Sequence, residues 1–188
     1  TDSTHLSPEA LGQAREYIRD RFGSDYLPEK PNYFGSSNKS AQEAHEAIRP
    51  TDVRRTPDAV ASALTPEQAR LYGLIWNRFV ACQMTPAEWD KTIIEFERSD
   101  RDTGAVLRAN GRVLAFDGFY RVAGMPAGDE PVLPSLAERD EASPFGIDAD
   151  QLFTAPPARY SEASLVKKLE SEGIGRPSTY AAIVQKIQ

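Results

Sequence analysis

A change in hydrophobic period at Thr85-Pro86 constrains the fold of this chain more than any other feature. Before it, apolar residues recur every three to four positions, which is the period of an amphipathic helix. After it, β-branched and aromatic residues cluster in short runs that are typical of strands. From Pro156-Pro157 onward the helical period returns. Because helices and strands fall in separate blocks, we predict a multidomain α+β fold with a helical segment, an antiparallel β-rich segment and a short final helical segment.

The first block contains three predicted helices, each marked by residues that favour a helix terminus. Ser7 is a good N-cap ahead of a proline, and Gly23 can end the helix that follows. Thr65 begins a Thr-Pro-Glu-Gln run, which has the form of a capping box. The predicted helices cover residues 8–22, 41–48 and 65–84.

Apolar side chains at helical spacing define the faces that should form a core. On the first and third helices they are Leu11, Ala14, Ile18, Phe22, Leu71, Leu74, Ile75, Phe79 and Cys82. Cys82 is the single cysteine, which excludes an internal disulfide and a cysteine-rich zinc site. We predict that Cys82 is a buried structural thiol.

The middle block contains strand-like runs at residues 92–96, 105–108 and 113–122. Asn110-Gly111 separates the last two, and Asn-Gly between such runs is a strong hairpin signal. We therefore expect a tight turn at Asn110-Gly111, and one or two further strands within residues 138–153.

In the last block, Ser161 is predicted to cap a helix that Gly173 ends, and another helix opens at Pro177. The changes of period divide the chain into three predicted domains or parts of domains. Their boundaries are 1–85, 86–155 and 156–188.

The net charge of −6 is distributed unevenly. Residues 1–85 carry ten basic and eleven acidic side chains, residues 86–155 carry seven and fourteen, and residues 156–188 carry five and three. The three net charges are therefore −1, −7 and +2. Because nucleic-acid binding depends on basic groups local to the phosphates, the acidic total does not exclude a DNA partner.

No apolar run approaches the ~20 residues that span a bilayer, and no basic-then-apolar signal segment precedes the first predicted helix. We expect a soluble, cytoplasmic protein without a membrane partner, and a lone cysteine suits that compartment. Thr1 is not an initiator methionine and Gln188 falls inside a helical pattern, so we expect an internal fragment of a longer protein.

The nine residues 42–50, Gln-Glu-Ala-His-Glu-Ala-Ile-Arg-Pro, form the densest polar motif. On a helix, His45 and Arg49 are four positions apart and share a face. A titratable imidazole beside a planar guanidinium suits a phosphate. The alternative is a solvated, salt-bridged helix. Arg49 stands where a zinc-protease motif requires its second histidine, and there is no tight carboxylate cluster, so no metal site is predicted.

A second motif, Gly-Ile-Gly-Arg-Pro-Ser-Thr at 173–179, combines two glycines with a predicted helix N-terminus. Free N–H groups there, with Arg176, Ser178 and Thr179, are suited to holding a phosphate. Arg159 and Ser161 are candidates for the same surface. The alternative is an ordinary glycine-capped turn between two helices.

Four blocks of this sequence together resemble bacterial type IA DNA topoisomerases. They are TDST at 1–4, QEAHEAIRP at 42–50, FVACQMTPA at 79–87 and PPARYSEASLVKKLESEGIGRPSTYA at 156–181. Their order and spacing fit the family over essentially the whole chain, more loosely from 97 to 155. The QMTPA stretch and the length of the β-rich region favour topoisomerase I over topoisomerase III, which shares the GIGRPSTYA block.

In that family a tyrosine within a Tyr-x-Arg-Thr-Asp-Ser motif attacks DNA and forms a 5′-phosphotyrosine link. The resemblance implies that Thr1 and Asp2 are active-site positions, and that His45 lies near the scissile phosphate. It implies a single-strand DNA groove as well. The DNA-binding residues predicted from the motifs and the resemblance are Arg49, Arg159, Ser161, Arg176, Ser178 and Thr179.

The resemblance further implies a helical gate at 1–85, a β-rich arch at 86–155 and the start of a DNA-groove domain at 156–188. The longer protein would relax negatively supercoiled DNA with magnesium and without a nucleotide cofactor. Because the nucleophile and the metal-binding domain are absent from these residues, we expect them to be inactive alone and to bind single-stranded DNA weakly. The alternatives are a topoisomerase III-like decatenase and a non-catalytic single-strand DNA-binding module.

Overall fold

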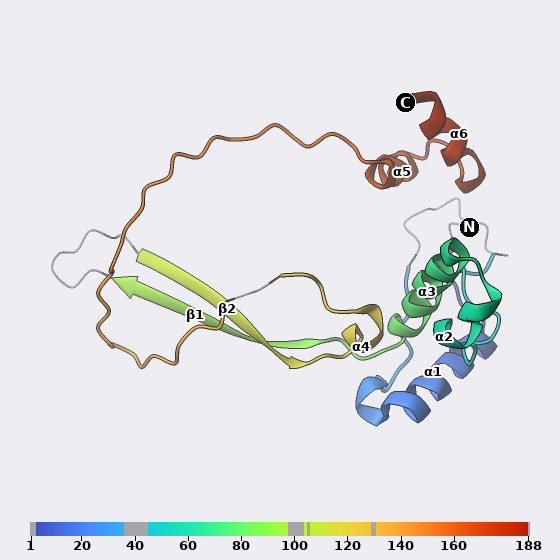
Figure 1. Ribbon diagram of the computed structural model, residues 1–188, viewed down its shortest axis with the longest axis horizontal. Helices are drawn as coiled ribbons and strands as arrows, with labels where there is room; N and C mark the ends of the chain where they lie inside the picture. The colour runs from blue at the N-terminus through green and yellow to red at the C-terminus, as the bar shows by residue number, and fades with distance from the viewer. Residues whose placement is uncertain (1–2, 36–44, 98–103, 105, 129–130, 188) are drawn as a thin grey trace. The chain divides into compact units, whose positions relative to one another are not determined.

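The computed structural model describes residues 3–35, 45–97, 104, 106–128 and 131–187 (Figure 1). The chain divides into two compact units, one formed by Met84–Phe153 and the other by Thr1–Gln83 together with Thr154–Gln188. The regular elements are α1 (Pro8–Phe22), η1 (Ser24–Tyr26), α2 (Pro57–Val60), η2 (Ala61–Ala63), α3 (Pro66–Ala81), β1 (Glu88–Glu97), β2 (Val106–Phe116), α4 (Tyr120–Ala123), α5 (Glu162–Ser171) and α6 (Pro177–Ile187). This mixture of helices with an antiparallel two-stranded sheet confirms the predicted α+β class.

Helix α1 begins and ends where the sequence predicts. The Ser7 hydroxyl accepts a hydrogen bond from the Ala10 N–H, and Pro8 occupies the first turn. At the other end Gly23 adopts a φ of 99° and donates its N–H to the Arg19 carbonyl at 3.0 Å. Ala10, Ala14 and Ile18 form the buried face.

Helix α3 has the predicted capping box, in which Thr65 and Gln68 exchange side-chain and backbone hydrogen bonds. Its buried face differs from the prediction, because Leu71 and Leu74 are 58% and 69% exposed. The buried column contains Trp76 instead, whose indole N–H donates to the Val53 carbonyl at 2.8 Å. Helical spacing alone does not say which of two adjacent apolar columns will find a partner.

The core of the helical region lies between α1, α3 and the loop that precedes α2. Tyr17 of α1 meets Trp76 of α3 edge to face, with ring centroids 5.6 Å apart. The loop is tied down by an ion pair between Arg54 and Glu16 at 2.9 Å and by the Tyr72 hydroxyl, which donates to the Arg55 carbonyl. Helix α2 was not predicted, although its Thr-Pro start resembles that of α3.

The two strands form an antiparallel ladder in which Thr92 faces Gly111 and Glu88 faces Phe116. Strand β2 runs through Asn110-Gly111 without a break, so the predicted turn there is wrong. Gly111 serves close packing instead, since a Cβ at this position would lie 2.4 Å from the Pro131 carbonyl oxygen. The connection between the strands falls at 98–105, almost entirely outside the described residues.

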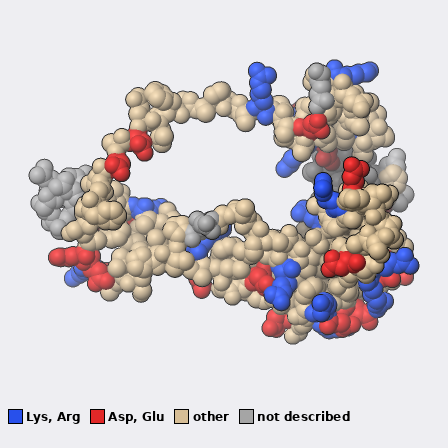
Figure 2. Space-filling model, viewed as in Figure 1, with Lys and Arg blue, Asp and Glu red and all other residues tan. Residues whose placement is uncertain are grey.

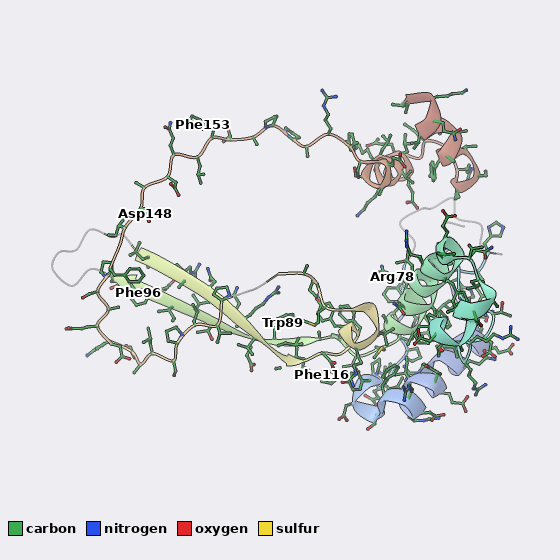
Figure 3. All side chains as sticks on the ribbon, in the orientation of Figure 1. Arg78, Trp89, Phe96, Phe116, Asp148 and Phe153 are labelled. Atoms are coloured by element: carbon green, nitrogen blue, oxygen red, sulfur yellow. The ribbon has the colours of Figure 1, made fainter. Side chains whose placement is uncertain are left out.

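The predicted strand over 113–122 ends at Phe116, and a turn leads into α4. Gly118 in this turn has a φ of 48°. It packs against the backbone of Thr85 and Pro86, the two residues that precede β1 by a short connection. The Phe119 N–H donates to the Thr85 carbonyl at 2.9 Å. Figure 3 shows Trp89 and Phe116 near the end of the ladder where β1 begins.

No strand forms within 138–153, so that expectation is also wrong. The apolar residues of this stretch, such as Phe145 and Leu152, remain exposed, because no described strand edge pairs with them. Residues 142–153 carry two aspartates and no basic side chain, and Figure 2 shows this part of the chain as mostly uncharged.

The last two helices begin as predicted. Ser161 and Ser164 form a capping box at the start of α5, and Gly173, with a φ of 68°, follows its end. Pro177 opens α6. In the described part of the chain no helix is both long enough and apolar enough to cross a membrane.

Candidate functional site

The predicted active-site residues Thr1 and Asp2 lie outside the described residues. The residues that follow them lead directly into α1. Within this stretch the His5 N–H donates to the Ser3 hydroxyl at 3.2 Å, and the Thr4 hydroxyl donates to the Phe34 carbonyl at 2.8 Å. The stretch is therefore attached to the loop that follows α1.

Residues 45–50, which carry most of the polar motif at 42–50, form no helix and no strand. The Ala47 N–H donates to the His5 carbonyl at 2.7 Å, so this segment lies against the residues that precede α1. The predicted helix over 41–48 is wrong for 45–48, and 41–44 lie outside the described residues. Tertiary hydrogen bonds override the helical propensity of this stretch, and His45 and Arg49 do not share a helix face.

Glu46 fixes the position of this segment. Its Oε1 accepts hydrogen bonds from the Ser7 N–H and from the Arg49 Nε, both at 2.8 Å, and its Oε2 accepts one from the Arg49 Nη2 at 3.1 Å. The hydrogen bonds from Arg49 and then from Ser7 lower the pKa of Glu46 to about 2. The carboxylate is therefore ionised at neutral pH and forms a bidentate pair with the guanidinium.

Arg49 has its charge neutralised by this pair, and its Nη1 also donates to the Pro50 carbonyl at 3.2 Å. The hydrogen bond that Arg49 donates to Glu46 raises the pKa of Arg49. The guanidinium thus positions the segment in this structure. Its predicted contact with DNA stays a prediction.

His45 stands one residue before Glu46 and is exposed. Among the described residues its imidazole makes no hydrogen bond or ion pair. The imidazole is therefore accessible, while the backbone that carries it is anchored at the next residue, Glu46. This backbone lies next to the segment that continues from Thr1 and Asp2.

The loop at residues 27–35, which follows η1, is held by a buried amide that was not predicted from the sequence. Gln83 is fully buried, and its side chain accepts from the Asn32 N–H at 3.1 Å and donates to the Asn32 carbonyl at 2.8 Å. The Asn32 side chain donates in turn to the Cys82 carbonyl at 3.1 Å. The signal was present, because Gln83 belongs to the FVACQMTPA block.

Cys82 is half-buried, and its thiol donates to the Phe79 carbonyl. Burial raises the pKa of this thiol, so it is poorly suited to act as a nucleophile. A structural environment fits the prediction, with partial rather than complete burial.

Two of the predicted DNA-binding hydroxyls near the C-terminal end, those of Ser161 and Thr179, bond to the backbone at the start of a helix. Thr179 Oγ1 accepts from the Arg176 N–H at 2.8 Å and donates to the Arg176 carbonyl at 3.0 Å, while Ser161 caps α5. The side chains of Arg159, Arg176 and Ser178 are exposed. Two exposed guanidinium groups are therefore available here, and the hydroxyls of Thr179 and Ser161 shape the backbone beside them.

A divalent metal does not fit the residues that the structure describes. No group of three or more His, Cys, Asp or Glu side chains among them is placed to hold a metal ion. No catalytic step through magnesium is therefore derived from these residues.

A family match, similar sequences and a similar solved structure all point to DNA topoisomerases. The family described as DNA topoisomerase matches residues 1–188. DNA topoisomerase 1 of Pseudomonas aeruginosa is 52% identical over 190 residues, and that of Escherichia coli is 50% identical over 192 residues. Each match covers 100% of this chain and 21% of the relative.

Among solved structures, full-length topoisomerase I from Thermotoga maritima superposes with a TM-score of 0.68 at 34% identity. The match covers 100% of this chain and 29% of that one. The chain thus spans about a fifth of the length of the curated relatives it matches.

Proposed function

We propose, because this chain belongs to the family of bacterial type IA DNA topoisomerases, that it is part of an enzyme that relaxes negatively supercoiled DNA. The enzyme would cleave one strand transiently, pass DNA through the break and reseal it. The relatives cited above carry the name DNA topoisomerase 1, which favours relaxation over the decatenation expected of a topoisomerase III. Such an enzyme would act on the bacterial chromosome in the cytoplasm.

One observation carries this proposal. The segment bearing His45 is docked through Ala47 and Glu46 against the residues that continue from Thr1 and Asp2, because Ala47 bonds to His5 and Glu46 bonds to Ser7. This attachment is expected if His45 serves the chemistry that takes place next to Thr1 and Asp2.

In the proposed reaction the oxygen of a tyrosine attacks the DNA phosphorus, a P–O bond to tyrosine forms, and the bond to the 3′ oxygen breaks. Resealing reverses these changes, so the phosphodiester energy is conserved and no nucleotide is consumed. The His45 imidazole would donate a hydrogen bond to a phosphate oxygen as charge develops. Residues outside this chain would hold the magnesium.

We further propose that these 188 residues do not cleave DNA by themselves. None of the seven tyrosines is followed by x-Arg-Thr-Asp-Ser, and neither His45 nor Asp2 can replace a missing tyrosine nucleophile. Incubation with supercoiled plasmid and magnesium should give no relaxation. Nicking or relaxation above a buffer control would contradict this.

The role of His45 can be tested in a chimera of the Pseudomonas aeruginosa relative that carries residues 1–188 in place of the matched segment. We expect His45→Ala to slow plasmid relaxation by roughly 100-fold or more, the usual loss when a hydrogen-bond donor to the developing charge is removed. His5→Ala is the matched control, because His5 is also exposed and only its backbone takes part in the docking. Equal rates for the parent chimera and His45→Ala would refute the assignment.

Weak single-stranded DNA binding is proposed for the last 33 residues, which carry a net charge of +2. Fluorescence anisotropy with a short oligonucleotide should show a salt-sensitive affinity that falls in Arg176→Ala. Lys186→Ala removes one charge at the other end of α6 and serves as the control. Equal losses in both variants would indicate a general charge effect rather than a groove at Arg176.

A further inference from the structure

Two aromatic side chains stand out next to the candidate site. Tyr33 is 80% exposed and Phe34 is 52% exposed. Single exposed apolar residues are common on proteins and need no explanation by themselves. These two differ because the backbone that carries them is held firmly on both sides.

On one side, the residue before Tyr33 is fixed by the buried amide of Gln83. Both the N–H and the carbonyl of Asn32 are hydrogen-bonded to that amide, at 3.1 and 2.8 Å. Further back, the Arg15 Nη2 donates to the Pro28 carbonyl at 2.7 Å. A loop without regular structure is thus anchored to both α1 and the end of α3.

On the other side, the Phe34 carbonyl accepts the hydrogen bond from the Thr4 hydroxyl. Thr4 closes the TDST motif, and the next residue, His5, accepts from Ala47 of the segment that carries His45. The aromatic pair and His45 therefore belong to backbone segments that meet at residues 4 and 5.

We propose that Tyr33 and Phe34 form a stacking platform for one or two nucleobases of the single strand beside the scissile phosphate. The platform depends on the proposed function, since it presupposes a DNA strand at His45. Stacking suits an enzyme that acts on many sequences, because every base has a π-face. A ring on a pre-anchored backbone also loses little conformational entropy when a base stacks on it.

The charge around the pair agrees with a nucleic-acid occupant. Lys30 is exposed three residues before Tyr33, it makes no ion pair among the described residues, and residues 30–35 contain no acidic side chain. Within residues 30–35 a phosphate on either side of a stacked base would therefore meet a lysine and no carboxylate, and the nearest acidic residue before this stretch is Glu29.

The test uses the full-length enzyme that carries this segment and a 3′-labelled single-stranded oligonucleotide. An abasic site is moved along the oligonucleotide one position at a time, and binding is measured at each position. In the parent enzyme, one or two adjacent abasic positions should weaken binding by about 5-fold to about 100-fold. In the Tyr33→Ala/Phe34→Ala double variant, the intact oligonucleotide should bind more weakly by the same factor. The abasic sites that weaken binding to the parent enzyme should have no further effect on the variant.

Conservative variants separate stacking from other roles. Tyr33→Phe should keep the parent abasic profile, whereas Tyr33→Leu should lose part of it, because leucine is apolar but has no π-face. Phe145→Ala is the matched control, since Phe145 is fully exposed and lies in the other compact unit. It should leave the profile unchanged.

An abasic profile that is unchanged in the double variant would overturn the platform. Loss of thermal stability in the double variant would also overturn it, because the two rings would then pack against another part of the longer polypeptide. A change in oligomeric state would overturn it as well, because the rings would then contact a second copy of the protein. The proposed function is read separately, by the protein-linked 3′-labelled product on a denaturing gel. If the parent enzyme forms that product while the abasic profile does not depend on the two rings, the platform alone is wrong.

Discussion

The helical segment, residues 3–83, and the hairpin unit, residues 84–153, are stabilised in different ways. Every buried hydrophobic residue in the described part of the chain lies at or before Met84: Ala10, Ala14, Ile18, Val53, Trp76, Phe79, Val80, Ala81 and Met84. In the hairpin unit Ile93 and Leu107 stay 45% and 66% exposed. The buried positions beyond Met84 are two glycines, Gly111 and Gly118.

The two regions should therefore be sensitive to different kinds of substitution. The helical segment depends on a packed core, so it should suffer most when apolar volume is removed. The hairpin unit depends on close approaches of backbone to backbone, so it should suffer most when volume is added at a glycine. Substitutions at Gly118 and at Ile18 and Ile93 test that contrast and have the largest expected effects. Substitutions at Glu46 and Leu74, with smaller expected effects, test contacts within the helical segment.

Gly118→Val should have the largest effect. A Cβ at this position would lie 2.5 Å from the Pro86 carbonyl, and the φ of 48° is unfavourable for a β-branched residue. We expect a loss of about 4 kcal/mol in unfolding free energy, seen as faster amide hydrogen exchange in β1 and β2. Gly12→Ala is the control, because nothing lies within 4 Å of its Cβ, and it should be neutral or stabilising.

Ile18→Ala should cost about 3 kcal/mol, because Ile18 is fully buried and its truncation leaves a cavity. Ile93→Ala in the hairpin should cost less than about 1 kcal/mol, since that side chain is already 45% exposed. Urea unfolding of both variants measures the difference. Similar costs would mean that the hairpin has a core of its own.

Glu46→Gln should lower stability by roughly 1 kcal/mol at neutral pH, a modest value because the Glu46 side chain is 32% exposed. The folded-state pKa of Glu46, about 2, lies below its ordinary value of 4.5. Its contribution is therefore complete above about pH 4.5 and is lost as the pH falls toward 2.

Thermal unfolding of the parent protein and of Glu46→Gln should be measured from neutral pH down to about pH 2. The difference in stability between the two proteins should shrink as the pH falls below about 4.5. A difference that stays constant from pH 7 to pH 2.5 would show that the Glu46 charge does not stabilise the docked segment.

Leu74→Gln should have the smallest effect, within about 0.5 kcal/mol, because Leu74 is 69% exposed on α3. Phe79→Gln on the same helix is the matched comparison and should cost several times more, since Phe79 is only 5% exposed. A large loss in Leu74→Gln would place this face of α3 in a contact that the present structure does not contain.

Helix ends were predictable from the sequence because capping is local. Ser7, Thr65 and Ser161 each bond a backbone group three residues away, so the residues that decide the cap are adjacent in the sequence. The same holds for Gly23 and Gly173, whose positive φ ends the helix before them. No distant contact is needed to make these features form.

Features that depend on distant partners were predicted incorrectly or missed. Asn110-Gly111 has the composition of a turn, but its glycine is required by the approach of Pro131. Residues 45–48 have helical propensity, but Ala47 and Glu46 bond to residues that precede α1. In each case a hydrogen bond or close contact across more than 15 residues outweighs the local preference.

The candidate site shows both levels together. The motifs by themselves identified the family of DNA topoisomerases, predicted Thr1, Asp2 and His45 as active-site positions, and predicted the helices of the first and last blocks. The tertiary structure alone decided that Glu46 and Arg49 are positioning residues, and that Tyr33 and Phe34 are anchored beside them. The physical reason is range, because a cap satisfies backbone groups within one turn, whereas a docked segment gains its hydrogen bonds only when distant parts of the chain have already packed.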